Sequence, residues 1–150
     1  MAYDWVYPPR QGGEALIHLN WGKYHTLTKI YHGFRQWCLP LVPGMKVIQT
    51  KLKGPAATGI SQPGLKASAF ISEDGKRIVI HAAAVSEKAI PIRLILDGGG
   101  SFRVQRYRTS STEDMVQLPV IEWQDASAET LPAGSMMTWV FSKQDRNPDQ

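Results

Sequence analysis

Histidines and the single cysteine are the side chains whose chemistry depends most on spacing. The four histidines are His18, His25, His32 and His81. His25 and His32 are seven positions apart, which on a helix separates them by about 10 Å along the axis, too far to share a metal ion. A spacing of four would suit such a site. Cys38 belongs to an apolar helical stripe and is expected to be a small buried hydrophobic residue. We therefore predict no metal, no cofactor and no cysteine nucleophile.

Acidic residues near turns are a second group with possible chemistry. Glu113 and Asp114 are adjacent, and Glu122 precedes Asp125 by three positions. Carboxylate oxygens beside turns suit a hard cation such as Ca²⁺, but the spacing is not that of an EF-hand loop. Solvated surface carboxylates are the favoured interpretation, and a structural calcium stays open.

The composition is that of one globular domain. The chain has 150 residues, 43% of them hydrophobic and 20% charged, which excludes disorder of the whole chain. A single cysteine excludes an internal disulfide framework. No apolar run reaches the roughly 18–20 residues that cross a bilayer. Residues 1–10 are aromatic and Pro-rich with Asp4 among them, unlike a signal peptide. No membrane partner is predicted.

Positive charge is concentrated in the middle of the sequence. Residues 46–109 carry eleven basic and four acidic groups, whereas residues 110–150 carry two and seven. The basic residues are spread over several predicted strands and turns rather than gathered on one element with aromatic partners, as in a nucleic-acid binder. We predict no nucleic-acid partner, and we interpret the basic residues as the solvated outer faces of a sheet.

Apolar periodicity divides the chain into one helix and many short strands. Apolar residues recur every three or four positions over Lys23–Cys38, which predicts an amphipathic helix that ends before Pro40. After Gly44 the period becomes two, and turn residues separate the segments. The predicted strands are Met45–Lys53, Leu65–Ser72, Arg77–Ala84, Ile90–Leu96, Phe102–Thr109, Val116–Trp123 and Ser135–Ser142. They predict a mainly β fold, an antiparallel β-sandwich of about seven to eight strands with one N-terminal α-helix.

The predicted helix carries a wide apolar stripe. Its members are Tyr24, Leu27, Ile30, Tyr31, Phe34, Trp37 and Cys38. Because an apolar patch of this size is seldom left in water, we expect the stripe to pack against the sandwich or to form a homodimer through helix Lys23–Cys38. Trp37 and Trp139 are both expected in the core.

Several short motifs, in this order, resemble a known family. They are Lys23–Leu27, Ile30–Trp37, Val42–Met45, Asp74–Lys76, Arg106–Ser110 and Leu131–Thr138. Together they resemble the last barrel helix, the barrel-to-sandwich junction and the accessory sandwich of clan A glycoside hydrolases, especially family 30 xylanases and glucanases. The resemblance runs from about Ala2 to Lys143. His81 stands where such sandwiches often have an Asn at the end of a strand.

This resemblance implies a division of the chain and a role. Residues 1–44 would be the remnant of the last barrel strand and helix, 45–143 the accessory sandwich, and 144–150 a flexible tail. The family's catalytic carboxylates lie on earlier barrel strands, and neither Asp4 nor Glu14 matches them. The chain alone is therefore expected not to be catalytic. Its parent would be a secreted glycoside hydrolase, although this chain shows no signal peptide.

Aromatic side chains are the predicted sugar-binding groups. Pyranose rings present flat C–H faces that pack against indole and phenol rings. In the family an aromatic residue after the last barrel strand lines the sugar cleft, which implicates Trp5. Tyr7 follows the same strand and lies with Trp5 at the centre of that surface, which Tyr3 and Trp21 would extend. Tyr107 and Trp123 lie on predicted strands with polar neighbours and form a second candidate, with packing in the core as the alternative for both.

Three functions remain open on the sequence. The preferred one is an accessory domain that stabilises a catalytic barrel and contributes to binding cellulose- or xylan-type glycans. The second is a purely structural module in which every aromatic ring is buried. The third is an unrelated β-sandwich that binds anionic polymers through its basic middle segment.

Overall fold

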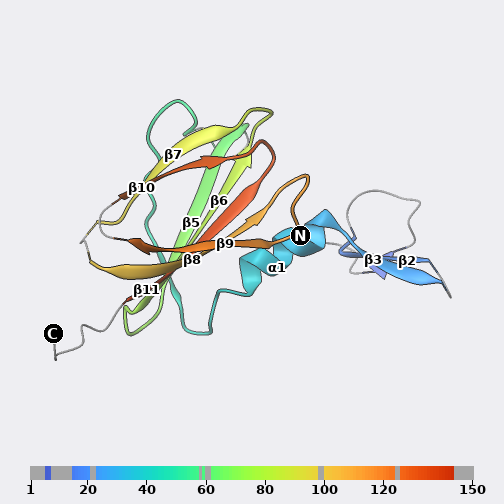
Figure 1. The fold of residues 1–150 in the computed structure, drawn as a ribbon, viewed down its shortest axis with the longest axis horizontal. Coiled ribbons are helices and arrows are strands. Elements are labelled where there is room, and N and C mark those ends of the chain that lie inside the picture. Colours follow the sequence, from blue (N-terminus) through green and yellow to red (C-terminus); the bar gives the residue numbers. More distant parts are fainter. Residues whose placement is uncertain are drawn as a thin grey trace.

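Strands dominate the structure, a computed structural model that describes residues 6–7, 15–20, 23–57, 59, 62–97, 100–123 and 126–143 (Figure 1). The segment before the sandwich holds β1 (Val6–Tyr7), β2 (Ile17–Asn20), β3 (Tyr24–Leu27) and the helix α1 (Lys29–Cys38). The sandwich strands are β4 (Lys46–Ile48), β5 (Gly64–Ile71), β6 (Arg77–Val85), β7 (Ile90–Ile95), β8 (Phe102–Thr109), β9 (Val116–Trp123), β10 (Ala126–Leu131) and β11 (Met136–Lys143). The predicted mainly β fold with one helix is confirmed.

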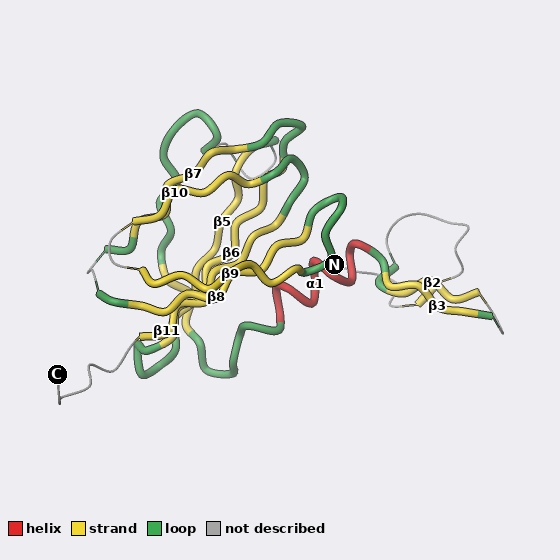
Figure 2. Tube along the Cα trace, in the orientation of Figure 1, coloured by secondary structure: helices red, strands yellow, loops and turns green. Residues whose placement is uncertain are grey.

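Two antiparallel sheets make up the sandwich. The larger has six strands in the order β4-β5-β6-β11-β8-β9, and the smaller pairs β10 with β7. In Figure 2 the small sheet lies over one face of the large one. The last strand, β11, runs between β6 and β8, so the C-terminal part of the chain closes the centre of the large sheet. A separate sheet of β1, β2 and β3 lies beyond α1 (Figure 1).

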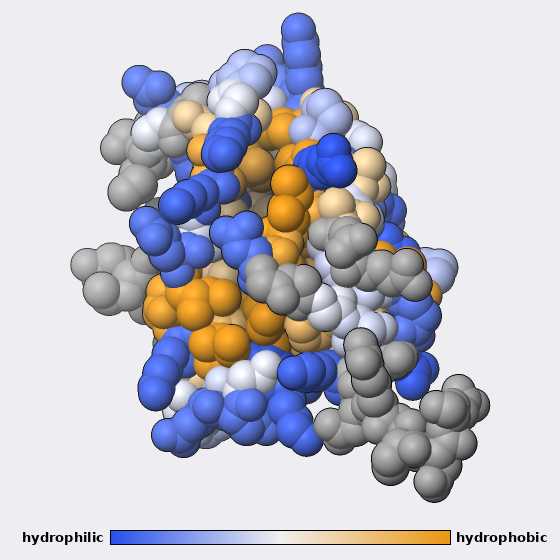
Figure 3. Space-filling model, turned by 90° about the vertical axis from the view of Figure 1, so that its left-hand side faces the viewer, coloured by the Kyte–Doolittle hydropathy of each residue, from blue (hydrophilic) through white to orange (hydrophobic). Residues whose placement is uncertain are grey.

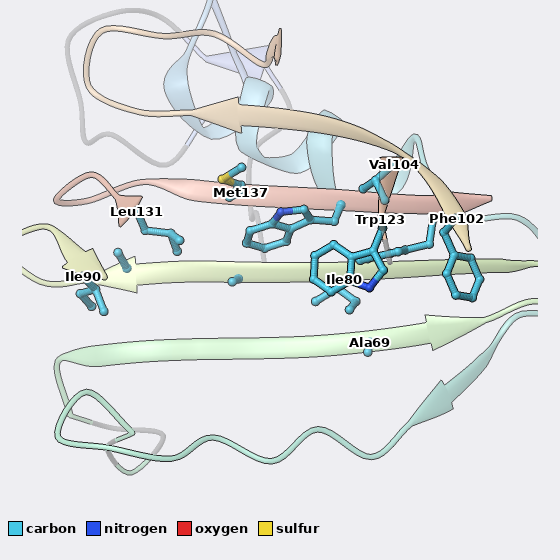
Figure 4. Packing of buried hydrophobic residues seen from close by; sticks show 12 residues of the cluster. Ala69, Ile80, Ile90, Phe102, Val104, Trp123, Leu131 and Met137 are labelled. Carbon is cyan, nitrogen blue, oxygen red and sulfur yellow. The ribbon is translucent and has the colours of Figure 1, made fainter. Parts of the chain in front are cut away.

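Alternating apolar residues on the large sheet build the core between the two sheets. Trp139, Phe141 and Met137 on β11 are each 0% exposed, and Leu131 of β10 and Ile90 of β7 cover them from the small sheet. Figure 4 shows Met137, Leu131 and Ile90 among the side chains of this core. The predicted burial of Trp139 is confirmed. One indole can bury about 150–250 Å², so this residue is a main source of the sandwich's stability.

A half-buried ion pair joins the two sheets. A register shift in the β8–β9 pairing lies between Val104 and Arg106. Arg106 Nη1 donates to Glu129 Oε1 of β10 at 2.5 Å. The same guanidinium donates from Nε and Nη2 to the carbonyl oxygen of Pro119, at 3.2 and 2.9 Å. The positive charge of Arg106 on the large sheet and the negative charge of Glu129 on the small sheet are thus paired inside the sandwich, beside the edge strand β9.

Within the helix and the sandwich, the elements differ from the sequence prediction by more than one residue in three places. The helix begins at Lys29 rather than Lys23, because Tyr24–Leu27 forms the strand β3 and Thr28 caps the helix. The strand β4 covers only Lys46–Ile48. The strand β10 was not predicted. Its partly buried residues include Glu129, and a charged residue at that position is typical of a loop.

The surface carries apolar groups as well as charged ones. Figure 3 views the molecule from the end of the sandwich away from β2 and β3, where apolar side chains gather between hydrophilic ones. The helix α1 sits between the sandwich and the β2–β3 hairpin (Figure 1). No helix of the described residues is long and apolar enough to cross a membrane.

Candidate functional site

The helix α1 is fixed at both ends by local hydrogen bonds. At its start, the Thr28 hydroxyl accepts from the backbone N–H of Tyr31 at 3.2 Å and donates to the carbonyl oxygen of Ala15 at 2.8 Å. Such an N-cap satisfies one of the donors that a helix start leaves free. At its end, Leu39 N–H bonds to the Arg35 carbonyl oxygen, and Pro40 follows. These contacts fix where α1 begins and ends.

Gln36 joins α1 to the large sheet. Its side chain is 0% exposed, and its amide nitrogen lies 3.0 Å from Thr138 Oγ1 and 3.1 Å from each of the carbonyl oxygens of Tyr107 and Met136. Its amide oxygen accepts from Thr109 Oγ1 at 2.6 Å. One glutamine therefore contacts both β8 and β11. Because all these groups are buried, each bond that is lost leaves an unpaired polar group in the interior.

An aromatic stack lies beside this glutamine. The His81 ring of β6 stacks on Trp37 of α1 with centroids 4.4 Å apart and an angle of 19° between planes. Phe70 of β5 meets the same imidazole edge-on at 5.9 Å. His81 Nδ1 lies 2.8 Å from Thr138 Oγ1, the atom that also contacts Gln36. Burial lowers the pKa of His81 to about 4, so this ring is neutral at pH 7.

Charged side chains hold the first turn of α1. Lys29 pairs with Asp114 in the β8–β9 loop, and Arg108 Nη2 pairs with Glu113 at 2.6 Å in the same loop. The hydrogen bond from Lys29 lowers the pKa of Asp114, and the hydrogen bond from Arg108 lowers the pKa of Glu113. The acidic pair weighed as a calcium site is thus engaged in ion pairs. No group of three or more His, Cys, Asp or Glu in the described part of the chain could hold a metal.

Most of the apolar stripe of α1, apart from Trp37, which stacks on His81, faces away from the sheet, and this corrects the packing predicted from the sequence. Phe34 is 46% exposed, Ile30 is 41% exposed and Cys38 is also exposed. Successive helical residues turn by 100°, so Phe34 and Cys38, each two positions from the buried Gln36, point nearly opposite to it. The expected burial of Cys38 is therefore wrong. Trp37 is only partly buried, at 38% exposed, rather than in the core.

The chain matches solved structures by fold. A GH30 endoxylanase from Clostridium papyrosolvens C71 matches with a TM-score of 0.64 and 22% identity over 78% of this chain. The catalytic domain of GH30 xylanase C from Talaromyces cellulolyticus gives 0.68 and 21% over 87%, and a conserved exported protein from Bacteroides fragilis gives 0.68 and 22% over 91%. This chain spans about 28% of the length of each of the three. No protein-family model matches the sequence, nor does any curated protein.

The chain resembles a GH30 C-terminal domain. The resemblance recognised in the sequence is thereby confirmed at the level of fold. In this GH30-like domain, α1 and the strands before it precede the sandwich in the order that the sequence motifs predicted.

The predicted sugar-binding residues of the GH30-like domain are not gathered in one place among those described. Trp5 and Trp21 lie outside the described residues, and Tyr7 is in β1 without a described side chain. Tyr107 is half-buried on the face of β8 that lies toward α1, with its hydroxyl 3.5 Å from Gln105 Oε1. Trp123 is 3% exposed and meets Phe141 edge-on at 5.1 Å. For Trp123 this arrangement favours the alternative weighed from the sequence, packing in the core.

Sequence reasoning missed the polar residues of the junction between α1 and the large sheet. Gln36 interrupts the helical pattern, and His81 and Thr138 interrupt apolar strands. A polar residue at a strand position that should be buried was a usable signal, because such groups are hydrogen-bonded when buried. Their partner could not be read from the sequence, since Gln36 and Thr138 are 102 positions apart.

Proposed function

We propose that this chain is the accessory β-sandwich of a polysaccharide-degrading glycoside hydrolase, joined to the end of its catalytic barrel. The observation that carries the proposal is the fold match to GH30 xylanases, which covers 78–87% of this chain and 28% of theirs. Residues 1–44 then belong with the barrel, 45–143 form the accessory sandwich and 144–150 a tail. The catalytic carboxylates come from the parent, a secreted enzyme, in line with the exported neighbour.

The exposed side of α1 supports a barrel as the missing partner. Ile30 and Phe34 on α1 are each more than a third exposed, and on β3 Leu27 is 38% and Tyr24 60% exposed. A hairpin such as β2–β3 and an apolar helix face gain stability only when another layer covers them. In this proposal the catalytic barrel of the parent enzyme supplies that layer. The homodimer proposed from the sequence would cover the same face.

The domain's first task in this proposal is to hold the last barrel helix. Gln36 ties α1 to the large sheet by hydrogen bonds, and Lys29 ties it to the β8–β9 loop through its ion pair with Asp114. A helix held in this way presents its apolar side in a fixed orientation. The sandwich would therefore stabilise the barrel by limiting how α1 can move.

The second task is binding plant cell-wall glycans, with the aromatic residues predicted from the sequence. Trp5, Tyr7 and Trp21 remain the proposed primary surface, and Tyr107 the secondary one. Trp123 has too little exposed ring for a sugar to stack on without rearrangement. Each stacked ring contributes on the order of 1 kcal/mol, so affinities nearer the millimolar-to-micromolar range are expected.

Titration with xylo- and cello-oligosaccharides tests the sugar-binding part. We expect tryptophan fluorescence or NMR signals to shift at millimolar sugar, and Trp5→Ala to weaken the shift. Tyr24→Ala is the matched control, since Tyr24 is exposed but outside the proposed surface. If neither sugar perturbs any aromatic signal, the purely structural module replaces this part. Binding to an acidic polymer that falls steeply with salt would favour the third function.

Sedimentation of the purified chain tests the barrel-facing side. We expect a monomer that binds a hydrophobic dye, with dye binding reduced in Phe34→Ser. A stable dimer that the same substitution dissociates would show that a second copy covers α1 instead. Hydrolysis of aryl-glycosides and soluble xylan should stay at background. Turnover that disappears in Glu14→Ala or Asp4→Ala would overturn the accessory role.

A further inference from the structure

His81 lies at the centre of the contact between α1 and the large sheet. Its ring is 1% exposed and is enclosed by Trp37 on one face and Phe70 at an edge. Nδ1 contacts Thr138 Oγ1, while Nε2 is buried without a hydrogen-bond partner among the described residues. The imidazole therefore contacts the helix and two strands while only one of its two nitrogens is paired.

The hydrogen-bond network sets the protonation of this ring. Gln36 Nε2 can only donate to Thr138 Oγ1, so the Thr138 hydroxyl keeps its own proton to donate. The nearest acceptor for that proton is His81 Nδ1 at 2.8 Å, which places the ring's proton on Nε2. A second proton on Nδ1 would turn this acceptor into a donor. Thr138 is 0% exposed, so its displaced hydroxyl proton would have no water to bond.

The surroundings of His81 do not stabilise a positive charge. The residues of α1, β5, β6 and β11, the elements packed around the ring, include no Asp or Glu. The charged groups on these elements are all cations: Lys29 and Arg35 on α1, Lys66 on β5, Arg77 on β6 and Lys143 on β11. The acidic residues that contact Lys29 at the start of α1, Glu113 and Asp114, have their carboxylates paired with Arg108 and Lys29. An imidazolium here would be buried without a counter-charge, which is costly.

We propose that the contact between α1 and the large sheet is an acid-sensitive latch, in which protonation of His81 releases α1 from the sheet. The proton is taken up by Nδ1 once the ring leaves Thr138. Release separates Trp37 from the imidazole and frees Gln36 from β8 and β11. The sandwich core, on the opposite face of the sheet, contains no titratable partner of this ring and stays folded.

The pH range of the latch follows from the ring's two environments. The pKa of His81 is lowered from 6.5 to about 4 while α1 is docked. The undocked form therefore binds more protons than the docked form between these values, and docking weakens as pH falls through that range. With an ordinary pKa after release, the opening equilibrium of α1 rises about 30-fold from pH 7.5 to pH 5. Glu113 and Asp114 stay charged there, because their pKa values are lowered below 4.5 and 3.8.

Hydrogen exchange across this pH range tests the latch in the whole chain. Protection factors, corrected for the intrinsic pH dependence of exchange, are compared for amides of α1 and of β11. We expect α1 to lose about 30-fold protection between pH 7.5 and pH 5, while β11 loses much less. In His81→Phe, which keeps an aromatic ring against Trp37 but cannot be protonated, the extra loss on α1 should vanish. Equal losses on α1 and β11, or an unchanged loss in His81→Phe, would overturn the proposal.

Two further measurements separate His81 from other groups. His32→Gln removes the histidine that lies on α1 itself, whose Nε2 is 3.9 Å from Asp114 Oδ2. This variant should keep the acid sensitivity, and its loss there would assign the effect to His32 and overturn the proposal. The NMR titration of His81 in the unmodified chain does not depend on how His81→Phe folds. An apparent midpoint between about 4 and 6 is expected, and one at or above 6.5 would contradict the latch.

Discussion

The two faces of the six-stranded sheet are buried by different interactions. On the face toward the small sheet, Trp139 and Phe141 pack among apolar side chains and are 0% exposed. On the face toward α1, Thr138 is equally buried but is surrounded by the polar groups of Gln36 and His81. Because successive side chains of a strand point to opposite faces, adjacent residues of β11 take part in the two faces. Apolar packing depends on volume, whereas the polar face depends on each donor meeting its acceptor.

The difference indicates separate tasks for the two faces. Apolar burial holds the sandwich together whether or not anything covers the far side. The polar face bonds one particular helix in one orientation, because Gln36 must reach β8 and β11 at once. Loss of the helix contact should therefore leave a folded sandwich, and loss of the core should unfold both.

The largest effect is expected from Trp139→Ala on the apolar face. Removing the indole leaves a cavity at the centre of the sandwich and should cost about 3–5 kcal/mol in the free energy of unfolding. Urea denaturation followed by circular dichroism measures it. Trp37→Ala is the matched control on the other face, where the ring is 38% exposed. An equal loss in both variants would contradict the distinction between the two faces.

Gln36→Leu should have the second-largest effect. The substitution keeps much of the volume but leaves Thr109 and two backbone carbonyl groups of the sheet without their partner, at a cost of about 1–3 kcal/mol. The loss should be concentrated in α1, so hydrogen exchange should rise there more than in β6. Arg35→Ala, at an exposed position beside it, is the control and should change little. A uniform rise in exchange would show that the two faces are not separable.

Lys29→Met should have a smaller effect that depends on pH. Lys29 lowers the pKa of Asp114, so the pair stabilises the fold above the ordinary value of 3.8, and this contribution is lost as pH falls through the lowered value. Both side chains are about half exposed, and such pairs contribute little. We expect a lower melting temperature at pH 7 and convergence with the unmodified chain in strong acid. A difference that persisted there would assign the effect to the lysine's packing instead.

Phe34→Ser should have the smallest effect on the isolated chain. The ring is 46% exposed on the side of α1 away from the sheet, so the free energy of unfolding should change by no more than about 0.5 kcal/mol. Thermal unfolding of the dilute chain measures it. A large loss would mean that the ring stabilises the isolated chain more than its 46% exposure indicates, and the face of α1 proposed to meet the barrel would then be smaller.

The apolar face could be predicted from the sequence, and the polar face could not. Phe102–Thr109 and Val116–Trp123 were predicted with the observed bounds because apolar alternation and flanking turns mark them. The strand β10 was not predicted because Glu129 is partly buried only through its ion pair with Arg106 across the sandwich. No local sequence pattern reveals such a pairing. For the helix, the stripe was visible but the side that meets the sheet was not. Gln36 decides that orientation, through partners 71 to 102 positions away.

The exposed edges of the two sheets bear on how the protein behaves when concentrated. On β9, Pro119 lacks an N–H, and its carbonyl oxygen is already bonded by Arg106. The opposite edge, β4, has only three residues and begins with Lys46, and β7 contains Pro91. Proline, lysine and very short strands at an edge hinder the addition of a strand from another molecule. These features disfavour polymerisation into fibrils by strand addition. The domain can therefore reach high concentrations in solution without edge-to-edge pairing of sheets from different molecules.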